Sequence, residues 1–163
     1  MNKEYELDKI DKQILSILMK DANATYAEIA SSLDVSGGTI HVRMKKLEQI
    51  GVITGMHLVT NYAKLGFDIC AYIGIDFSDG ADIPKIREMC KQIPEITHFD
   101  VTTGRYNAIL QIACKHNTHL LKILEKKLSP IGGIAHYEIL VSLECVFSRK
   151  IDLVAIDENK DFE

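Results

Sequence analysis

The hydrophobic residues of this 163-residue chain change their spacing near Phe67. Before that point, apolar residues recur every three or four positions, which is the repeat of amphipathic helices. After it, stretches of alternating apolar residues are interleaved with helical stretches, a pattern typical of a domain that mixes strands and helices. We therefore predict an N-terminal helical domain at residues 1–60, a linker at 61–66, a second domain at 67–150 and an acidic tail at 151–163.

The first two predicted helices are defined by an apolar stripe and by a cap. Apolar residues at helical spacing predict a first helix from about Leu7 to Lys20. A short second helix is expected after Thr25, because Glu28 lies three positions later and the two side chains can form a capping box. The tight turn at Asp34 and Val35 then leads into a third helix.

The third helix is predicted to begin after Ser36 and to bury Ile40, Met44 and Leu47, which fall on one side of a helical wheel. A glycine ends it, and residues 52–60 predict a strand or wing. The outward face carries small, polar and basic residues, namely Gly38, His41, Val42, Lys45, Lys46 and Gln49. Two helices joined by a short turn, with a wing behind them, predict a winged helix-turn-helix DNA-binding domain.

The overall charge argues against nucleic-acid binding, since the net charge is −4 and the pI is near 5.9. The charges are sorted along the chain, however. Acidic residues gather in the first predicted helix and before it, whereas Arg43, Lys45 and Lys46 lie together on the third helix. Because the local field matters more than the total charge, a specific reader of DNA remains compatible with this composition.

The second domain is predicted to be an α+β domain of the ferredoxin-like type. We expect both faces of its first strand to be covered, because apolar residues occur on both. The predicted elements are a strand at 69–77, a helix at 82–92, strands at 98–103 and 108–114, a helix at 117–127 that Asn117 caps and that buries Leu120, Leu121, Leu124 and Leu128, and a strand at 134–147. The order βαββαβ is that of a ferredoxin-like sandwich.

Several classes of protein are disfavoured by the sequence. No apolar run reaches the ~18 residues that a membrane-spanning helix needs, and the amino terminus is polar and acidic rather than a signal peptide. The four cysteines form no CxxC pair, so we expect buried, reduced thiols in a cytoplasmic protein without a membrane partner. No metal-binding, phosphate-binding or nucleophile motif is complete, so we predict no catalytic residue, no metal and no cofactor.

These motifs, taken together, resemble the Lrp/AsnC family of bacterial and archaeal regulators over about residues 7–150. The resemblance is carried by DKIDKQIL at 8–15, Val35-Ser36, RMKKLE at 43–48, GVI at 51–53 and GRYN at 104–107. The runs GTIHVR, ITG and TTG are similar in particular to the asparagine-responsive AsnC branch. The resemblance implies homodimers formed through the second domain, assembly into octamers, and a small amino-acid effector bound between dimers.

Candidate DNA contacts follow from position on the third helix. Ser36, Gly38 and Thr39 lie at its N-terminus, where backbone N–H groups suit a phosphate. His41, Val42 and Lys45 are expected at base edges or the floor of the groove, Lys46 at a phosphate, and Thr25 joins them from the preceding helix. Arg43 lies on the flank of the helix, and an ion pair with an acid of the first helix and a phosphate contact are equally compatible with that position.

Candidate effector contacts lie in a predicted hairpin and in a loop expected to face it. A glycine there allows a positive φ and close approach of a ligand, and the polar neighbours can bind a carboxylate and an ammonium group. A plain β-turn explains the same residues without a ligand. The candidates are Thr102, Thr103, Gly104, Arg105, Tyr106 and Asn107 in the hairpin, and Gly133, Ala135 and His136 in the facing loop.

The histidines of the second domain allow other interpretations. His116 and His119 are three residues apart but have no third ligand nearby in sequence, which favours surface histidines over a metal site. His98 and His136 are expected to be partly buried in the sheet. Some relatives of this architecture look like siroheme decarboxylases, which use histidines of the second domain.

The sequence thus predicts a cytoplasmic transcriptional regulator that binds double-stranded DNA. Its effector is a small amino acid, with asparagine as the leading candidate. Two alternatives stay open at this point: a tetrapyrrole-processing enzyme of the siroheme decarboxylase type, and a ligand-binding assembly protein without affinity for DNA, which the acidic charge balance would favour.

Overall fold

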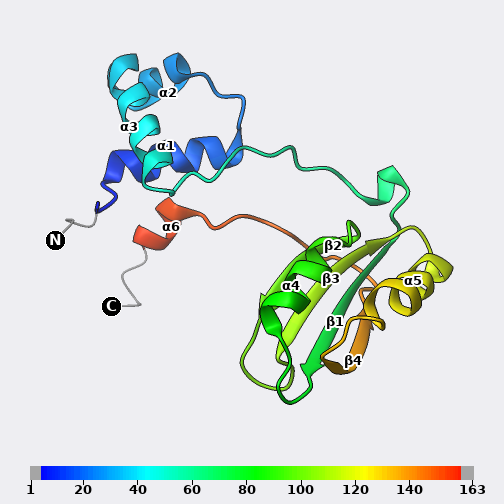
Figure 1. Cartoon of the computed structure of the whole chain (residues 1–163). Coiled ribbons are helices and arrows are strands. Elements are labelled where there is room, and N and C mark those ends of the chain that lie inside the picture. Colours follow the sequence, from blue (N-terminus) through cyan, green and yellow to red (C-terminus); the bar gives the residue numbers. More distant parts are fainter. Residues whose placement is uncertain (1–4, 159–163) are drawn as a thin grey trace. The chain divides into compact units, whose positions relative to one another are not determined.

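The computed structural model describes residues 5–158 and divides the chain into two compact units (Figure 1). Of the described residues, unit 1 contains 5–58 together with 147–158, and unit 2 is Val59–Val146. The C-terminal segment therefore folds with the N-terminal helices and not with the second domain.

Unit 1 begins with three helices, α1 (Lys9–Lys20), α2 (Tyr26–Ser32) and α3 (Gly37–Gln49). α1 starts slightly later than predicted, because the residue before it, Asp8, acts as its N-cap and accepts a hydrogen bond from the backbone N–H of Asp11 at 2.9 Å. The predicted caps of the other two helices are confirmed. The Thr25–Glu28 capping box precedes α2, and Ser36 accepts from the N–H of Thr39 before α3.

The core of unit 1 lies between these helices. Ile14 of α1, Ile29 of α2, and Ile40 and Met44 of α3 are at most 1% exposed, and Leu47 is fully buried. The predicted core face of α3 is thus confirmed, and its opposite face is left on the surface.

The predicted strand at residues 52–60 is wrong. After Gly51, whose φ is 75°, residues 52–60 form neither a helix nor a strand. A strand needs a neighbour to accept and donate its backbone hydrogen bonds, and the described part of the chain supplies none here. Leu58 and Val59 are consequently 89% and 86% exposed.

The C-terminal segment also differs from its prediction. Where an acidic tail was expected at 151–163, the structure contains a helix, α6 (Leu153–Glu158), that belongs to unit 1. Residues 159–163 lie outside the described part of the chain.

Unit 2 contains the predicted βαββαβ order (Figure 1). The linker holds a short 3-10 helix, Ala63–Leu65, and α5 continues into a π-helical turn at Leu124–Leu128. The other elements are β1 (Ile69–Phe77), α4 (Ile83–Lys91), β2 (Ile96–Val101), β3 (Ala108–Cys114), α5 (Asn117–Ile123) and β4 (Ile134–Val141), which ends earlier than predicted.

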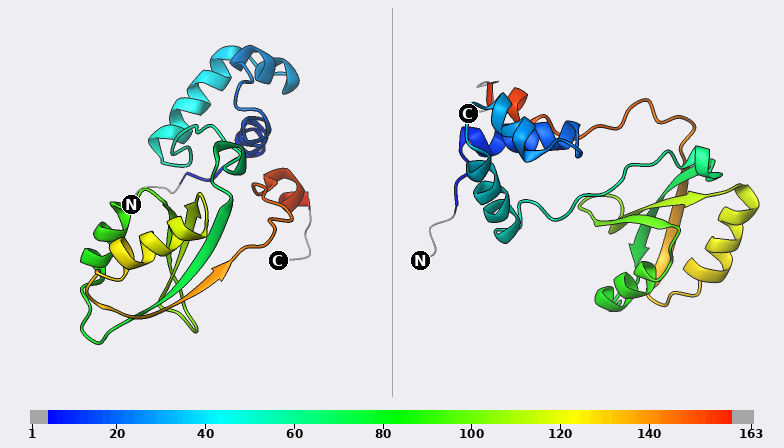
Figure 2. Two further views of the ribbon diagram at one scale, coloured as in Figure 1. Left: turned by 90° about the vertical axis from the view of Figure 1, so that its right-hand side faces the viewer. Right: turned by 90° about the horizontal axis from the view of Figure 1, so that it is seen from above.

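The four strands form one antiparallel sheet in the order β2-β3-β1-β4, so that β2 and β4 are its edges. The two α-helices of unit 2, α4 and α5, cover the same face (Figure 2). Ala71, Ile73 and Ile75 of β1 are fully buried on that face. The opposite face, which we call the open face, is covered only in part: Gly74 is buried beneath the Tyr106 ring, whereas Tyr72 and its cross-strand neighbour Leu140 are 41% and 51% exposed. The expectation that both faces of β1 are covered is thus met at Gly74 and not at Tyr72.

Smaller predictions for unit 2 also need correction. His116, rather than Asn117, caps α5: its Nδ1 accepts from the N–H of His119 at 3.1 Å. Leu121 is 52% exposed because it lies on the outer side of the helix. His98 and His136, expected to be partly buried, are exposed because they lie on the open face and at the edges of the sheet.

The cysteines are free, as expected, but they are not all buried. Burial raises the pKa of the Cys90 and Cys114 thiols to about 11, so both are poor nucleophiles. Cys70 is half-buried, and Cys145 is exposed because β4 ends before it. Within residues 5–158, no helix is long and apolar enough to cross a bilayer.

Candidate nucleic-acid interface and effector hairpin

The outward face of α3 is exposed and lacks acidic side chains along its centre. His41, Val42, Lys45 and Lys46 are all exposed, and Val42 is 67% exposed although it is apolar. An aliphatic side chain between cations suits contact with a thymine methyl group while the cations approach phosphates or base edges.

The N-terminus of α3 is open to a ligand. Ser36 Oγ caps the helix and lies 2.8 Å from Thr39 Oγ1. A Cβ added at Gly37 would meet no atom within 4 Å, and one added at Gly38 would meet only Ser36 Oγ at 3.7 Å. A side chain at either glycine would therefore cause no steric clash within the chain. The glycines leave room for another molecule to approach the backbone N–H groups at the positive end of the helix.

A hollow of about 730 Å³ runs along this side of α3. Gly38, Thr39, Val42 and Lys46 line it together with Arg43, and Tyr5 and Asp8 form its other wall. Most of the candidate DNA contacts are thus brought to one concave surface.

Aromatic rings flank two of the candidate contacts. The His41 ring lies 6.1 Å from that of Tyr26 on α2, tilted by 57°. Lys46 Nζ lies 5.4 Å from the centre of the Tyr5 ring, within the range of a cation–π contact. These rings restrict the side chains without neutralising a charge.

Arg43, one of the candidate DNA contacts, is engaged within the fold. Its Nη1 donates to Asp8 Oδ2 at 2.7 Å and to Asp11 Oδ1 at 2.8 Å. Asp11 is fully buried and also accepts from the hydroxyl of Tyr5 at 2.7 Å. Of the two alternatives, the ion pair with α1 is therefore the one present. We call Tyr5, Asp8, Asp11 and Arg43 the anchor cluster.

The electrostatics of the anchor cluster follow from these bonds. The hydrogen bond to Asp11 raises the pKa of Arg43 above its ordinary value, and the bond to Asp8 adds to this. The N–H of Asp11 lowers the pKa of Asp8, and Arg43 lowers it further. The hydrogen bonds of the cluster hold α3 against the start of α1.

Thr25 lies at the start of α2 and is exposed, but its hydroxyl is already bonded. It accepts from the N–H of Glu28 at 3.2 Å and donates to that carboxylate at 2.8 Å. A DNA contact by Thr25 would compete with this capping box.

The predicted hairpin between β2 and β3 is present and is closed by its own backbone. Thr102 N–H donates to Asn107 O at 3.0 Å, and the Thr102 hydroxyl donates to Tyr106 O at 2.7 Å. Gly104 has a φ of 110°, which confirms the need for glycine there. Thr103 and Arg105 are exposed, so the hairpin is an open surface rather than an enclosed pocket.

Tyr106 folds back over the open face of the sheet. Its hydroxyl donates to Glu138 on β4, which also receives Arg105 Nη2 at 2.8 Å. The ring lies directly on Gly74 of β1, where a Cβ would come within 2.6 Å of ring carbons. The bond to Glu138 raises the pKa of Tyr106.

Asn107 has a structural partner. Its Oδ1 accepts from the N–H of Phe77 at 2.8 Å, and its own N–H donates to Ile75 O at 2.9 Å. The amide therefore ties the hairpin to the end of β1, which leaves its NH₂ group for an acceptor.

The candidate residues of the facing loop, Gly133, Ala135 and His136, do not all lie on the same side of the sheet. A Cβ at Gly133 would lie 3.0 Å from Ile86 and 3.2 Å from Ala81, so this glycine packs on the helical layer and away from the hairpin. His136 of β4 lies opposite Asp76 of β1 in the sheet register. Both residues lie on the open face, as do Tyr106 and Glu138. Ala135 is exposed beside it.

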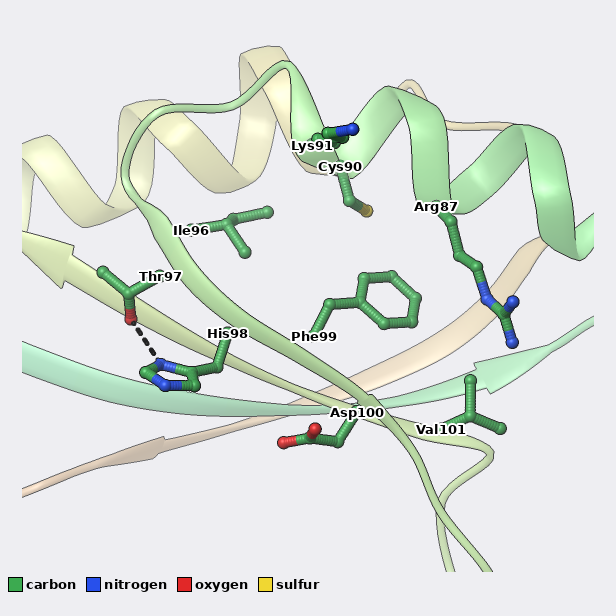
Figure 3. Close-up of a pocket in the computed structure, with 9 residues that line it drawn as sticks. All are labelled: Arg87, Cys90, Lys91, Ile96, Thr97, His98, Phe99, Asp100 and Val101. Carbon is green, nitrogen blue, oxygen red and sulfur yellow. Dashed lines mark hydrogen bonds between the residues drawn. The ribbon is translucent and has the colours of Figure 1, made fainter. Parts of the chain in front are cut away.

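The histidines are not gathered into one site. His116 and His119 face each other at 6.1 Å between ring centres, and each Nδ1 accepts a backbone N–H. His98 lines a hollow of about 540 Å³ between α4 and the edge strand β2, where Phe99 points toward α4 (Figure 3). Within residues 5–158, no group of three potential ligands is close enough to hold a metal ion.

The predicted site residues did not include Glu138 or Gly74, and they included Asp11 only as an unspecified acid of the first helix. Glu138 carries no local signal, because an acidic residue in an edge strand is ordinary. The sequence indicates only that an acidic residue of the first helix could pair with Arg43. It does not indicate which one, because 32 residues separate Arg43 from Asp11.

Comparison with known proteins gives a family for both units. Residues 7–54 match a model of winged helix-turn-helix DNA-binding domains, and residues 70–151 match a model of the Lrp/AsnC ligand binding domain. The regulatory protein AsnC of Haemophilus influenzae is 35% identical over 147 residues, which is 90% of this chain and 98% of that protein.

Solved structures agree with this assignment. The structure of Escherichia coli AsnC superposes with a TM-score of 0.85 at 34% identity, covering 91% of this chain and 99% of that one. A transcriptional regulator from Neisseria meningitidis, solved as a complex with L-methionine, has a TM-score of 0.84 at 19% identity and shares the fold, covering 88% of this chain and 94% of that one.

The AsnC relatives are regulatory proteins, and residues 7–54 of this chain match a DNA-binding domain. These two findings set aside the tetrapyrrole enzyme considered above. The open, cationic face of α3 in unit 1 and the sheet domain of unit 2 correspond to the two matched models. The chain therefore belongs to the Lrp/AsnC family and is a DNA-binding transcriptional regulator with a ligand-binding domain.

Proposed function

We propose that this regulator reads double-stranded DNA with α3 and responds to a small amino acid, with asparagine as the leading candidate. The single observation that carries the DNA-reading part is the exposed cationic face of α3 beside an unobstructed helix N-terminus. We assign base-edge contacts to His41, Val42 and Lys45, and phosphate contacts to Lys46 and to the N-terminal turn at Ser36, Gly38 and Thr39.

The effector site is proposed at the Thr102–Asn107 hairpin, with His136 and Ala135 beside it. Small-ligand sites are usually concave and bury most of their ligand, whereas this hairpin is open on its outer side. A second copy of the chain would supply the missing wall. The L-methionine complex of the Neisseria regulator supports an amino acid as the class of ligand, and similarity to AsnC favours asparagine.

Dimerisation is proposed through unit 2, with assembly of dimers into an octamer. The open face of the sheet exposes Tyr72 and Leu140 side by side, which is costly in water for a monomer. We further propose that the DNA-binding domain ends near residue 60, that the effector domain spans 67–150, and that the protein acts in the cytoplasm.

The DNA-reading assignment is tested by titrating the promoter region of the gene itself with the full chain at several salt concentrations. Lys45→Ala with Lys46→Ala is expected to weaken binding by at least tenfold and to lower the salt slope by about 1 for each phosphate contact that is lost. Lys122→Ala with Lys126→Ala is the matched control, because both lysines are exposed on unit 2 and the change in charge is the same. Equal binding by the two double variants would refute the assignment.

The effector assignment is tested by calorimetry with asparagine, glutamine, methionine and leucine. We expect one of these to bind, and we expect Thr103→Ala and Asn107→Ala to weaken its binding without changing DNA affinity in its absence. If neither variant changed the affinity for the amino acid, the proposal that the effector binds at the hairpin would be refuted.

A further inference from the structure

α1 is apolar on two faces, and the three-helix core uses only one of them. Ile10, Ile14 and Ile17 pack into the core of unit 1. Leu15 and Ser16 are also buried, with only 8% of each residue exposed. At 100° per residue, however, they point away from the side of the helix that faces this core. Another element must therefore cover that side of α1.

The C-terminal segment lies along the side of α1 that carries Ser16. α6 packs against α1 within unit 1, and Lys20 Nζ at the end of α1 lies 3.5 Å from Asp152 Oδ2. Ser16 and Met19 form a groove with Phe147, Ile151 and Ile156.

The start of α6 is built like that of a regular helix. The Asp152 carboxylate accepts from the N–H groups of Val154 and Ala155 at 3.2 and 3.3 Å, and these bonds lower its pKa. One side chain thus caps α6 and also faces Lys20 of α1. Val154 and Leu153 are half-buried, although α6 is only six residues long.

α6 is an addition to the part of the chain that defines the family. The match to the ligand-binding domain ends at residue 151, and the Escherichia coli AsnC structure, covered over 99% of its own length, corresponds to 91% of this chain. The family assignment therefore gives no role to α6.

We propose that residues 147–158 form a strap that docks α6 on α1 and gives unit 1 a second connection to unit 2. The chain leaves unit 1 after Leu58 and returns to it at Phe147, so with α6 docked two segments join the units instead of one. A second connection reduces the conformational freedom of unit 1 relative to unit 2. In the proposed dimer, this raises the effective concentration of the second DNA-binding unit at the DNA half-site next to the one that the first unit occupies.

The docking is tested on the full chain by amide hydrogen exchange. Removing residues 152–163, or changing the half-buried Val154→Asp, is expected to accelerate exchange in α1 by about tenfold, because the second face of the helix loses its cover. Removing only residues 159–163 keeps α6 and is the matched control. Leu143→Asp places the same charge at a residue of unit 2 that is 98% exposed, and neither control is expected to change exchange in α1.

If amide exchange in α1 were unchanged both in Val154→Asp and in the variant that lacks residues 152–163, the proposal that α6 docks on α1 would be overturned. The second measurement rests on the proposed function: loss of α6 should weaken DNA binding about threefold to tenfold with an unchanged salt slope, because the contacts of α3 stay intact. A weaker affinity with a smaller slope would contradict a pure tether. A complete lack of DNA binding by the wild type would refute the proposed function, and the exchange experiment would still decide the docking.

Discussion

Arg43 belongs to the helix that carries the candidate DNA contacts, yet its guanidinium serves the fold. It reaches two carboxylates of the neighbouring helix start, and one of these, Asp11, is fully buried. A buried carboxylate needs a partner, because an unpaired charge in the interior is strongly unfavourable. The same nitrogen, Nη1, donates to both acids, and arginine suits this task better than lysine because its planar guanidinium directs these N–H groups rigidly and is less strongly hydrated than an ammonium group.

Arg43→Ala is therefore expected to lower the free energy of unfolding of unit 1 by about 3 kcal/mol. Arg43→Lys should lie between this variant and the wild type, and the exposed Lys45→Ala should cost less than about 0.5 kcal/mol. Urea denaturation followed by helical circular dichroism measures all three. If Arg43→Ala were as stable as Lys45→Ala, the anchor cluster would have no structural importance.

Gly74 is a second residue whose role depends on a distant neighbour. Gly74→Ala should push the Tyr106 ring off the sheet, because the new Cβ would lie 2.6 Å from ring carbons. We expect a loss of about 1–3 kcal/mol in unit 2 and a fall of the Tyr106 pKa toward its ordinary value as the bond to Glu138 is lost. Tyrosine titration by NMR and thermal unfolding provide the measurements.

Gly132→Ala is the control for this substitution, because a Cβ at that position would meet no atom within 4 Å. Equal stability of the two alanine variants would mean that Tyr106 is not held on Gly74 in solution.

The second and third helices of unit 1 begin at the caps that the sequence predicts, and α1 begins at the Asp8 cap, which was not predicted. Each cap joins residues three positions apart, so its signal is contained in the local sequence. The predicted strand at 52–60 is absent for the opposite reason: a preference for extended backbone is local, but strand pairing is not. β1 forms a strand because β3 and β4 lie on either side of it.

The caps also make unit 1 sensitive to acid. Hydrogen bonds from backbone N–H groups lower the pKa of Asp8 and of Glu28. A carboxyl group whose pKa is lower in the folded state adds stability above its unfolded pKa, and this stability is lost as the pH falls through the folded value. The melting temperature of unit 1 should therefore be nearly constant from pH 7 to 5 and fall below about pH 4.

Asp8→Asn should reduce this acid dependence, because the amide does not titrate. Thermal unfolding of the wild type and the variant between pH 3 and 7 measures the difference. Two parallel curves would show that Asp8 does not contribute to it.

At the scale of the whole molecule, each unit has its own core. Ile40 of unit 1 and Leu110 of unit 2 are both fully buried, but they belong to separate hydrophobic clusters. The chain should therefore unfold in two steps, since neither core contains residues of the other.

Ile40→Ala and Leu110→Ala are each expected to cost about 2–5 kcal/mol, and each only in its own unit. Hydrogen exchange resolved along the chain distinguishes the two effects. Faster exchange throughout both units in either variant would show that they unfold as one body.

Periodicity and caps operate within a few residues, so the helix-turn-helix, the βαββαβ order and the exposed face of α3 follow from the sequence alone. It could not decide what Arg43 binds, where Tyr106 packs, whether residues 52–60 pair, or where the C-terminal segment docks. Arg43 and Asp8 are 35 residues apart, and Tyr106 and Glu138 are 32 apart. Such contacts exist only once the chain has folded, because chain closure over these distances, and not local preference, brings the partners together.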